Sequence, residues 1–326
     1  MRSIRLALLT ITAAALPLLS GLAPAAAEYP DHPVKVVVPF AAGGPTDVMA
    51  RLVAQKLSET LKQQFYVENR PGAGGNIGMS EVARAKPDGY TLLVASSSFV
   101  VNPSLYAHNP YDPYKDFTPI TLAAASPNIL VVNASFPAKS VKEMIDLLKK
   151  EPGKYTIANP GIGTTPQLAA ELFKLTFKLE QTSVPFNGAA PAIQSGIAGH
   201  TPIVFSALPP TSPQVKAGTL RGLAVTSGKR SAALPDVPTM AEAGVQDQES
   251  ETMQGVFAPG GTPKQIVDVL NKEIAKAMAM ADVKEKCDQL GFDPVANSPE
   301  QFAAYVKKEV DKWGAVIKQA KIPQIE

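Results

Sequence analysis

The sequence is short of the residues on which many enzyme and metal sites are built. Among its 326 residues are one cysteine, Cys287, and three histidines, His32, His108 and His200. A single cysteine excludes a disulfide within the chain and any CxxC metal or redox site. No histidine has a carboxylate or cysteine at ligand spacing, and the chain contains neither HExxH nor GxSxG, the signatures of zinc hydrolases and α/β-hydrolases. The sequence therefore predicts no catalytic residue, no metal site and no cofactor.

An excess of charge of either sign is also missing. Lys+Arg number 31 and Asp+Glu 29, so the formal net charge is +2, which is small for a protein whose partner is a phosphate backbone. The composition, 45% hydrophobic and 18% charged, excludes intrinsic disorder and low-complexity architectures. We expect a folded protein of about two domains with no nucleic-acid partner.

Residues 1–27 have the pattern of an export signal. Arg2 and Arg5 give a positive start, Leu6–Leu19 is an apolar run, and Ala25–Ala27 offers a small-residue cleavage site. At about 1.5 Å per residue, the apolar run is shorter than a bilayer core of about 30 Å. The sequence therefore predicts a signal peptide that is cleaved near Ala27 and a mature protein in the periplasm.

The first part of the mature chain alternates between strands and helices. Val34–Phe40, Phe65–Glu68 and Tyr90–Ala95 are predicted strands, and an apolar stripe from Met49 to Leu61 predicts a helix between the first two. This β-α-β order is typical of a parallel sheet covered by helices.

A second α/β set is expected to begin at Ile129–Val132. Ser140 and Glu143 predict a capping box at the start of the next helix. The fold class is therefore α/β with two closely connected lobes and a mainly parallel sheet in each. We assign residues 28–127 plus 250–326 to lobe 1, and residues 128–249 to lobe 2.

Two glycine-rich turns are the leading candidates for a binding site. Phe40–Asp47 and Asn159–Pro166 each follow a strand and open a helix, so both are expected at the carboxyl edge of a sheet. Glycine lets a ligand approach the backbone, and the free N–H groups of a helix start favour an anion. Neither turn contains Lys or Arg, so backbone amides and hydroxyl groups are expected to hold the anion. The candidate residues, with a serine pair that follows the third strand, are Phe40, Ala41, Ala42, Gly43, Gly44, Thr46, Asp47, Ser96, Ser97, Gly161, Ile162, Gly163, Thr164 and Thr165.

These turns have two other interpretations. Glycine turns also join strands to helices in proteins that bind nothing there, and Asp47 can shape its loop without touching a ligand. Gly161–Pro166 with Glu180 is similar to a dinucleotide fingerprint. However, Pro166 occupies the third glycine position, where close packing of helix on strand needs a residue without a side chain.

Several blocks of the sequence resemble the Bug receptors, the extracytoplasmic solute-binding proteins of tripartite tricarboxylate transporters. The resemblance implies a two-lobed Venus-flytrap fold that closes on a small carboxylate. It also implies a monomeric receptor that delivers its ligand to membrane permease subunits, with backbone amides and ordered water on the ligand carboxylate. The blocks span most of the mature chain: Pro39–Asp47 with Ala50 and Arg51, Glu68–Gly78, Lys86–Leu92, Tyr111–Pro113 with Asp116 and Phe117, Leu234–Thr239 and Pro259–Pro263.

The second lobe departs from the family pattern in ways that remove charge. Phe186-Asn187-Gly188 stands where the family has an aromatic residue, Lys and Gly, and Pro202 and Ser206 stand where acidic residues are common. Gln167 replaces a frequent His, and Met253 an expected Trp. We therefore add Phe186, Asn187, Ser206 and Ala207 to the candidate site.

These departures predict a ligand with a single carboxylate, or a carboxylate on an apolar or aromatic body, rather than an amino acid or a tricarboxylate. Two alternatives stay open. One is an exported enzyme that acts on a small carboxylate, and the other is a receptor that presents its ligand to a membrane kinase.

Overall fold

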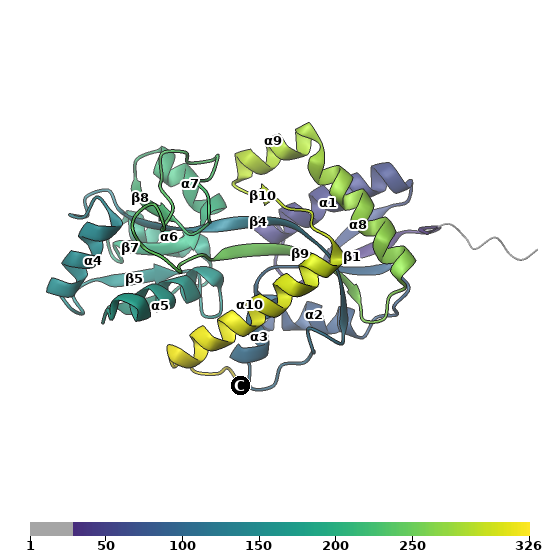
Figure 1. Ribbon diagram of the computed structural model, residues 1–326, viewed down its shortest axis with the longest axis horizontal. Coiled ribbons are helices and arrows are strands. Elements are labelled where there is room, and N and C mark those ends of the chain that lie inside the picture. The colour runs from purple at the N-terminus through teal and green to yellow at the C-terminus, as the bar shows by residue number, and fades with distance from the viewer. Residues whose placement is uncertain (1–28) are drawn as a thin grey trace, which may run out of the picture.

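The computed structural model describes residues 29–326, which form two lobes joined by two long strands (Figure 1). The predicted signal peptide, residues 1–27, and its cleavage site lie outside the described residues. Within residues 29–326, every helix is too short or too polar to span a bilayer.

Lobe 1 is built on three parallel strands, in the order β2-β1-β3. The predicted strands and the helix between the first two are confirmed to within a few residues, because long apolar runs between clear turns leave little choice of structure. The elements are β1 (Val34–Val38), α1 (Pro45–Leu61), β2 (Phe65–Asn69), a 3-10 turn η1 (Ala73–Gly75), α2 (Asn76–Ala83), β3 (Thr91–Ala95) and α3 (Ser98–Leu105).

Lobe 2 repeats this plan with the parallel strands β6-β5-β7. Helices follow the strands, so both lobes have the predicted α/β character. The elements are α4 (Val141–Lys150), β5 (Thr156–Asn159), α5 (Thr165–Phe177), β6 (Thr182–Pro185), α6 (Ala189–Ile197), β7 (Ile203–Ala207), α7 (Leu208–Lys216) and β8 (Leu220–Val225).

Two antiparallel strands, β4 (Phe117–Asn133) and β9 (Glu251–Pro259), run between the lobes (Figure 1). Ile129–Val132, where the second α/β set was expected to begin, are the second half of β4 rather than a separate strand. β4 pairs with β9 up to Pro127 and with β7 and β8 from Asn128 onward. The proposed lobe boundary between residues 127 and 128 falls at this change of partner.

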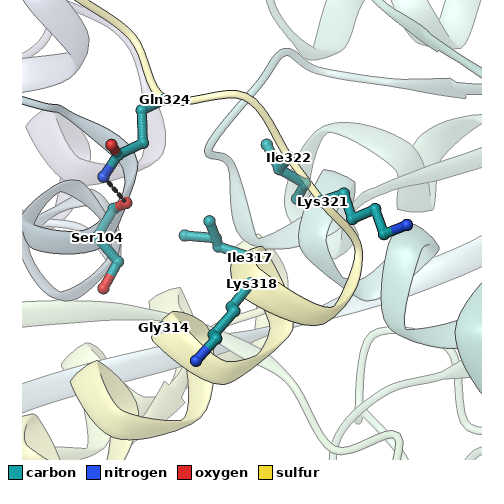
Figure 2. Close-up of a pocket in the computed structure, with 7 residues that line it drawn as sticks. All are labelled: Ser104, Gly314, Ile317, Lys318, Lys321, Ile322 and Gln324. Atoms are coloured by element: carbon teal, nitrogen blue, oxygen red, sulfur yellow. Dashed lines mark hydrogen bonds between the residues drawn. The ribbon is translucent and has the colours of Figure 1, made fainter.

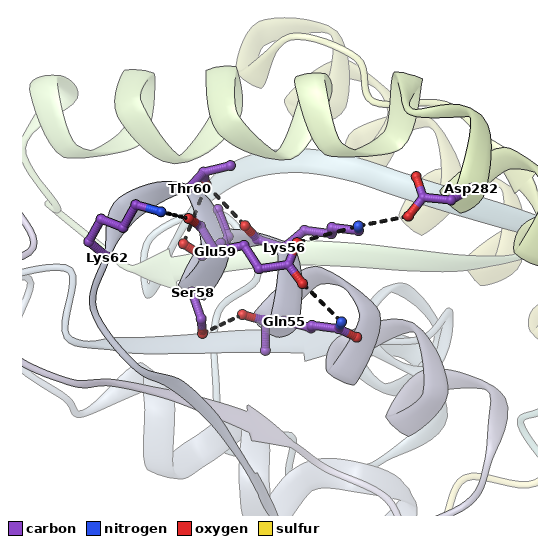
Figure 3. Close-up of polar contacts among 9 residues, drawn as sticks. Gln55, Lys56, Ser58, Glu59, Thr60, Lys62 and Asp282 are labelled. Atoms are coloured by element: carbon purple, nitrogen blue, oxygen red, sulfur yellow. Dashed lines mark hydrogen bonds and ion pairs between the residues drawn. The ribbon is translucent and has the colours of Figure 1, made fainter.

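The remaining elements return to lobe 1: α8 (Lys264–Ala279), α9 (Ala281–Leu290), β10 (Asp293–Pro294) and α10 (Pro299–Gln319). α1 shares a buried core with α8, and an ion pair of 2.8 Å joins Lys56 Nζ of α1 to Asp282 Oδ2 of α9 (Figure 3). Apolar contact with α8 and this ion pair with α9 both hold α1 in place, and the N-terminus of α1 is important below.

One predicted helix start is only half right. Ser140 Oγ accepts a hydrogen bond from the Glu143 amide, but Glu143 Oε2 accepts from the Lys139 amide instead of the Ser140 amide. The predicted capping box is therefore incomplete at α4. The full box is present at α10, where Ser298 and Gln301 bond to each other's backbone amides.

A half-buried carboxyl group, that of Glu251, lies at the start of β9. Burial raises the pKa of Glu251 to about 7, the carboxylates of Asp293, Glu249 and Glu309 add to this effect, and Lys229 opposes it. The folded protein therefore holds this proton at pH values where the unfolded chain has released it. Stability from this group is present at low pH and is lost as the pH rises from about 4.5 to about 7.

We expect Glu251→Gln, which cannot ionise, to gain unfolding free energy relative to the native protein as the pH rises through this window. Urea unfolding at pH 4.5, 5.5, 6.5 and 7.5 measures the difference. Glu285→Gln, an exposed change on α9, is the control and is expected to keep the native profile. A constant difference between Glu251→Gln and the native protein across the four pH values contradicts the assignment.

Candidate ligand-binding site

A cavity of about 480 Å³ lies between the two lobes, a size typical of small-molecule sites. None of the described residues that line it is Lys, Arg, His, Asp or Glu. Its walls combine apolar side chains with hydroxyl and amide groups: Phe40, Gly44, Pro45, Thr46, Gly74, Ser96, Ser97, Ser98, Asn102, Leu105, Tyr106, Pro160, Ile162, Gly163, Thr164, Thr165, Pro166, Gly188, Ala189, Ala207, Pro210, Thr252 and Gln254.

Five helices begin at this cavity. The first residues or N-caps of α1 and α3 in lobe 1, and of α5, α6 and α7 in lobe 2, line its wall. Each helix N-terminus carries the equivalent of about +0.5 elementary charge. The cavity is therefore favourable to an anion although its lining side chains carry no charge.

The turns before α1 and α5 have the same construction. Gly43 and Gly163 both have a positive φ, +83° and +79°, which glycine adopts without strain. In each turn the glycine amide donates to the side chain four residues later, Gly43 to Asp47 Oδ2 at 2.9 Å and Gly163 to Gln167 Oε1 at 3.2 Å. These bonds hold each loop so that its helix start faces the other lobe.

Neither helix is capped by a side chain. Gly44 has no side chain, and Thr164 Oγ1 donates to the Gly161 carbonyl at 2.7 Å instead of accepting from the helix. The amides of Thr46 and Thr165 have no acceptor within residues 29–326. By contrast, the N-cap serines of α4 and α10 do bond to first-turn amides. First-turn donors of α1 and α5 thus remain free for a ligand.

Asp47 belongs to the loop rather than to the cavity wall. Its carboxylate accepts hydrogen bonds from the Gly43 amide, Arg51 Nε at 3.0 Å and Asn69 Nδ2 at 2.9 Å. Burial acts to raise the pKa of Asp47, but these hydrogen bonds outweigh it and hold the pKa below its ordinary value. The carboxylate stays ionised and is neutralised by Arg51, so it orders the turn without repelling an anion in the cavity.

Most hydroxyl groups of the lining are already engaged. Ser97 Oγ donates to the Glu251 carbonyl and accepts from the Met253 amide, which ties α3 to β9. Thr165 Oγ1 lies 2.6 Å from Thr252 Oγ1. These hydroxyl groups position the wall of the cavity and leave the backbone amides as its main free donors.

The structure brings ten of the eighteen candidate residues to the cavity wall and places the other eight elsewhere. Ala41, Ala42, Gly43 and Asn187 are exposed, and Asp47 and Ser206 are buried. Gly161 and Phe186 are half-buried, away from the lining. The ten at the wall are Phe40, Gly44, Thr46, Ser96, Ser97, Ile162, Gly163, Thr164, Thr165 and Ala207.

Sequence reasoning missed the contributions of α3 and β9. Asn102, Leu105 and Tyr106 reach the cavity because the serine run opens α3, a helix that was not predicted. Thr252 and Gln254 come from β9, which the hydrophobic pattern alone did not identify as a strand. A single Gln within the apolar segment 253–259 was the available signal for a polar group at a buried site.

The lobes touch across the cavity. A Cβ atom at Gly163 of lobe 2 would lie 2.3 Å from Leu105 Cδ2 of lobe 1, so only glycine allows this approach. Leu168 of α5 is packed into the core of lobe 1 beside Phe99 and Trp313. The two lobes are therefore in contact, with the cavity between them.

Two further hollows lie under the C-terminal tail. One, of about 330 Å³, is lined by Lys318, Lys321 and apolar side chains, and Gln324 Nε2 donates to the Ser104 carbonyl across it (Figure 2). The other, of about 230 Å³, lies between the tail and α5.

A family model described as "Tripartite tricarboxylate transporter family receptor" matches residues 49–322 of the chain. Protein BugT of Bordetella pertussis is 35% identical over 300 residues, which are 91% of this chain and 92% of BugT.

Solved structures agree with these matches. The periplasmic binding protein BugD is 38% identical, with a TM-score of 0.79 over 91% of this chain and 100% of its own. The R. palustris protein Rpa4515, solved with adipate, is 37% identical, with a TM-score of 0.82 over 91% of this chain and 100% of its own. These values confirm the predicted two-lobed fold.

A methyl group at Gly163 is expected to hinder closure. Gly163→Ala places Cβ against Leu105, so the lobes have to stay apart or Leu105 has to shift into the cavity that it lines, where it takes space from the ligand. We expect the affinity for ligand, measured by calorimetry, to fall by about tenfold or more, equivalent to about 1.4 kcal/mol.

Gly153→Ala is the matched control, since Gly153 also has a positive φ, +70°, with nothing within 4 Å of the added Cβ. Both changes are expected to lower the melting temperature through the backbone strain of a left-handed alanine. Only Gly163→Ala is expected to lose affinity. An equal loss of affinity in both variants contradicts the role given to the contact between the lobes.

Proposed function

Because the chain belongs to the family of tripartite tricarboxylate transporter receptors, we propose that it captures a small carboxylate in the periplasm and delivers it to the membrane permease of such a transporter. The observation that carries the proposal is the convergence of five helix N-termini on a cavity without charged lining side chains. The family consists of receptors rather than enzymes, so the ligand leaves unchanged.

The carboxylate is held by the first-turn amides of α1 and α5, whose donors face each other across the closed lobes. A charge-assisted hydrogen bond contributes about 1.5–3 kcal/mol, and a favourable helix N-terminus adds about 0.3–1 kcal/mol. A few such contacts supply most of the roughly 8 kcal/mol that micromolar binding requires. An arginine or lysine in the wall is not needed for that affinity.

The ligand carries one carboxylate on a largely apolar body. Phe40, Leu105, Tyr106 and Ile162 line the cavity, which favours hydrocarbon or an aromatic ring beyond the carboxylate. An ammonium group finds no carboxylate among these walls and is repelled by the helix N-termini. Free amino acids are therefore poor ligands. A tricarboxylate would place three negative charges in one cavity without a cation to neutralise them.

Binding and delivery are coupled through closure. Donors on α1 belong to lobe 1 and donors on α5 to lobe 2, so an anion that bonds to both favours the closed arrangement over the open one. The ligand thereby shifts the population toward the shape that a permease can recognise.

A thermal-shift screen tests the ligand class. It compares three acids with a six-carbon chain, hexanoate, 6-aminohexanoate and adipate, and adds benzoate and citrate. We expect hexanoate and benzoate to raise the melting temperature, and 6-aminohexanoate and citrate to have no effect. Adipate is included because a relative of the chain is solved with it. Micromolar binding of citrate or 6-aminohexanoate, without binding of hexanoate or benzoate, overturns the proposal.

A further inference from the structure

β9, which pairs with β4, contributes two residues to the wall of the cavity. Thr252 lies opposite Ser126 and Gln254 lies opposite Ala124 in the antiparallel register, and paired residues project from the same face of a sheet. Thr252 and Gln254 both line the cavity. β9 therefore joins the two lobes and also presents polar side chains to the cavity between them.

The amide of Gln254 is unpaired, as is the hydroxyl group of its neighbour Ser126, but of the two only Gln254 lines the cavity. The residue is 0% exposed, and neither Oε1 nor Nε2 has a hydrogen-bond partner in the described part of the chain. Thr252, by contrast, pairs with Thr165 and donates to Asn128 Oδ1 at 3.2 Å. Buried polar atoms in native proteins are almost always bonded, so an unpaired amide at the wall of the cavity is available to a polar group of a ligand.

The chemistry of an amide restricts that partner. Nε2 needs an acceptor and Oε1 needs a donor, and this requirement is the same whichever way the amide is turned, because both atoms lack partners. A carboxylate, a ketone or an ether only accepts, and a hydrocarbon does neither. A hydroxyl group or a carboxamide does both.

We propose that Gln254 is a specificity-determining residue that recognises a hydroxyl or carboxamide group on the ligand, in addition to the carboxylate held by the helix N-termini. The inference rests on the proposed function and narrows it to hydroxy- and carbamoyl-substituted monocarboxylates. The second group is uncharged, in agreement with a cavity wall that has no charged side chain.

Calorimetry with four ligands of one chain length tests this assignment: hexanoate, 6-hydroxyhexanoate, adipamate and adipate. In the native protein we expect 6-hydroxyhexanoate and adipamate to bind about tenfold more tightly than hexanoate, and more tightly than adipate. In Gln254→Met, which keeps the length of the side chain and removes the amide, we expect the ratio of affinities to fall to about one. Gln254→Glu, which has no donor when ionised, should lose the same preference.

Gln248→Met is the matched control. Gln248 is also buried, but its Nε2 donates to Thr176 Oγ1, and the residue does not line the cavity. In Gln248→Met, the ratio of the affinities for the hydroxy and carbamoyl acids to the affinity for hexanoate should equal that of the native protein. Melting temperatures establish that each variant is folded.

The outcomes distinguish a failure of the proposed function from a failure of the role proposed for Gln254. If none of the four ligands binds the native protein and citrate or an amino acid does, the proposed function fails. If hexanoate or adipate binds as tightly as the hydroxy and carbamoyl acids, or if Gln254→Met keeps their preference, the role of Gln254 alone is wrong. The comparison within the native protein decides this even if a variant fails to fold.

Discussion

An anion in a cavity without cationic side chains has to be stabilised by the peptide groups themselves, and this constraint governs the rest of the structure. Peptide dipoles do so only where a helix begins, since the first-turn N–H groups lack acceptors within the helix. Five helices begin at the cavity. Their placement depends on strands that end at one edge and on turns such as those at Gly43 and Gly163, where a positive φ brings the chain from strand to helix in a few residues.

The same constraint explains why the two lobes have to close. Backbone donors act over short distances, so the first turns of α1 and α5 can share one carboxylate only when the lobes touch. The contact of Gly163 with Leu105 and the hydrogen bond between Thr165 and Thr252 hold the lobes together beside the cavity that both first turns line. Gln254 lines the same cavity, on one of the two strands that join the lobes. Capture, specificity and movement therefore share one set of residues.

Much of this plan could be predicted from the sequence. Glycine with a positive φ and proline at a helix start leave clear marks in the sequence, so both glycine turns that line the cavity were identified, and long apolar runs identified the strands around them. Features that depend on contacts between distant parts of the chain could not be predicted. Gln254 and Gly255 interrupt the apolar pattern of β9, and its partner β4 is more than a hundred residues away. Pro103 in α3 and Pro213 in α7 concealed two helix N-termini. The contact of Leu105 with Gly163 of the other lobe has no local sequence pattern that could predict it.

The most direct test of the account is the structure of a ligand complex, in which the distances from the carboxylate oxygens to their nearest protein nitrogens are measured. The account predicts backbone nitrogens from the first turns of α1 and α5, including Thr46 and Thr165, at about 2.7–3.2 Å. A carboxylate paired instead with a lysine, arginine or histidine side chain, or bound to one lobe alone, would contradict it.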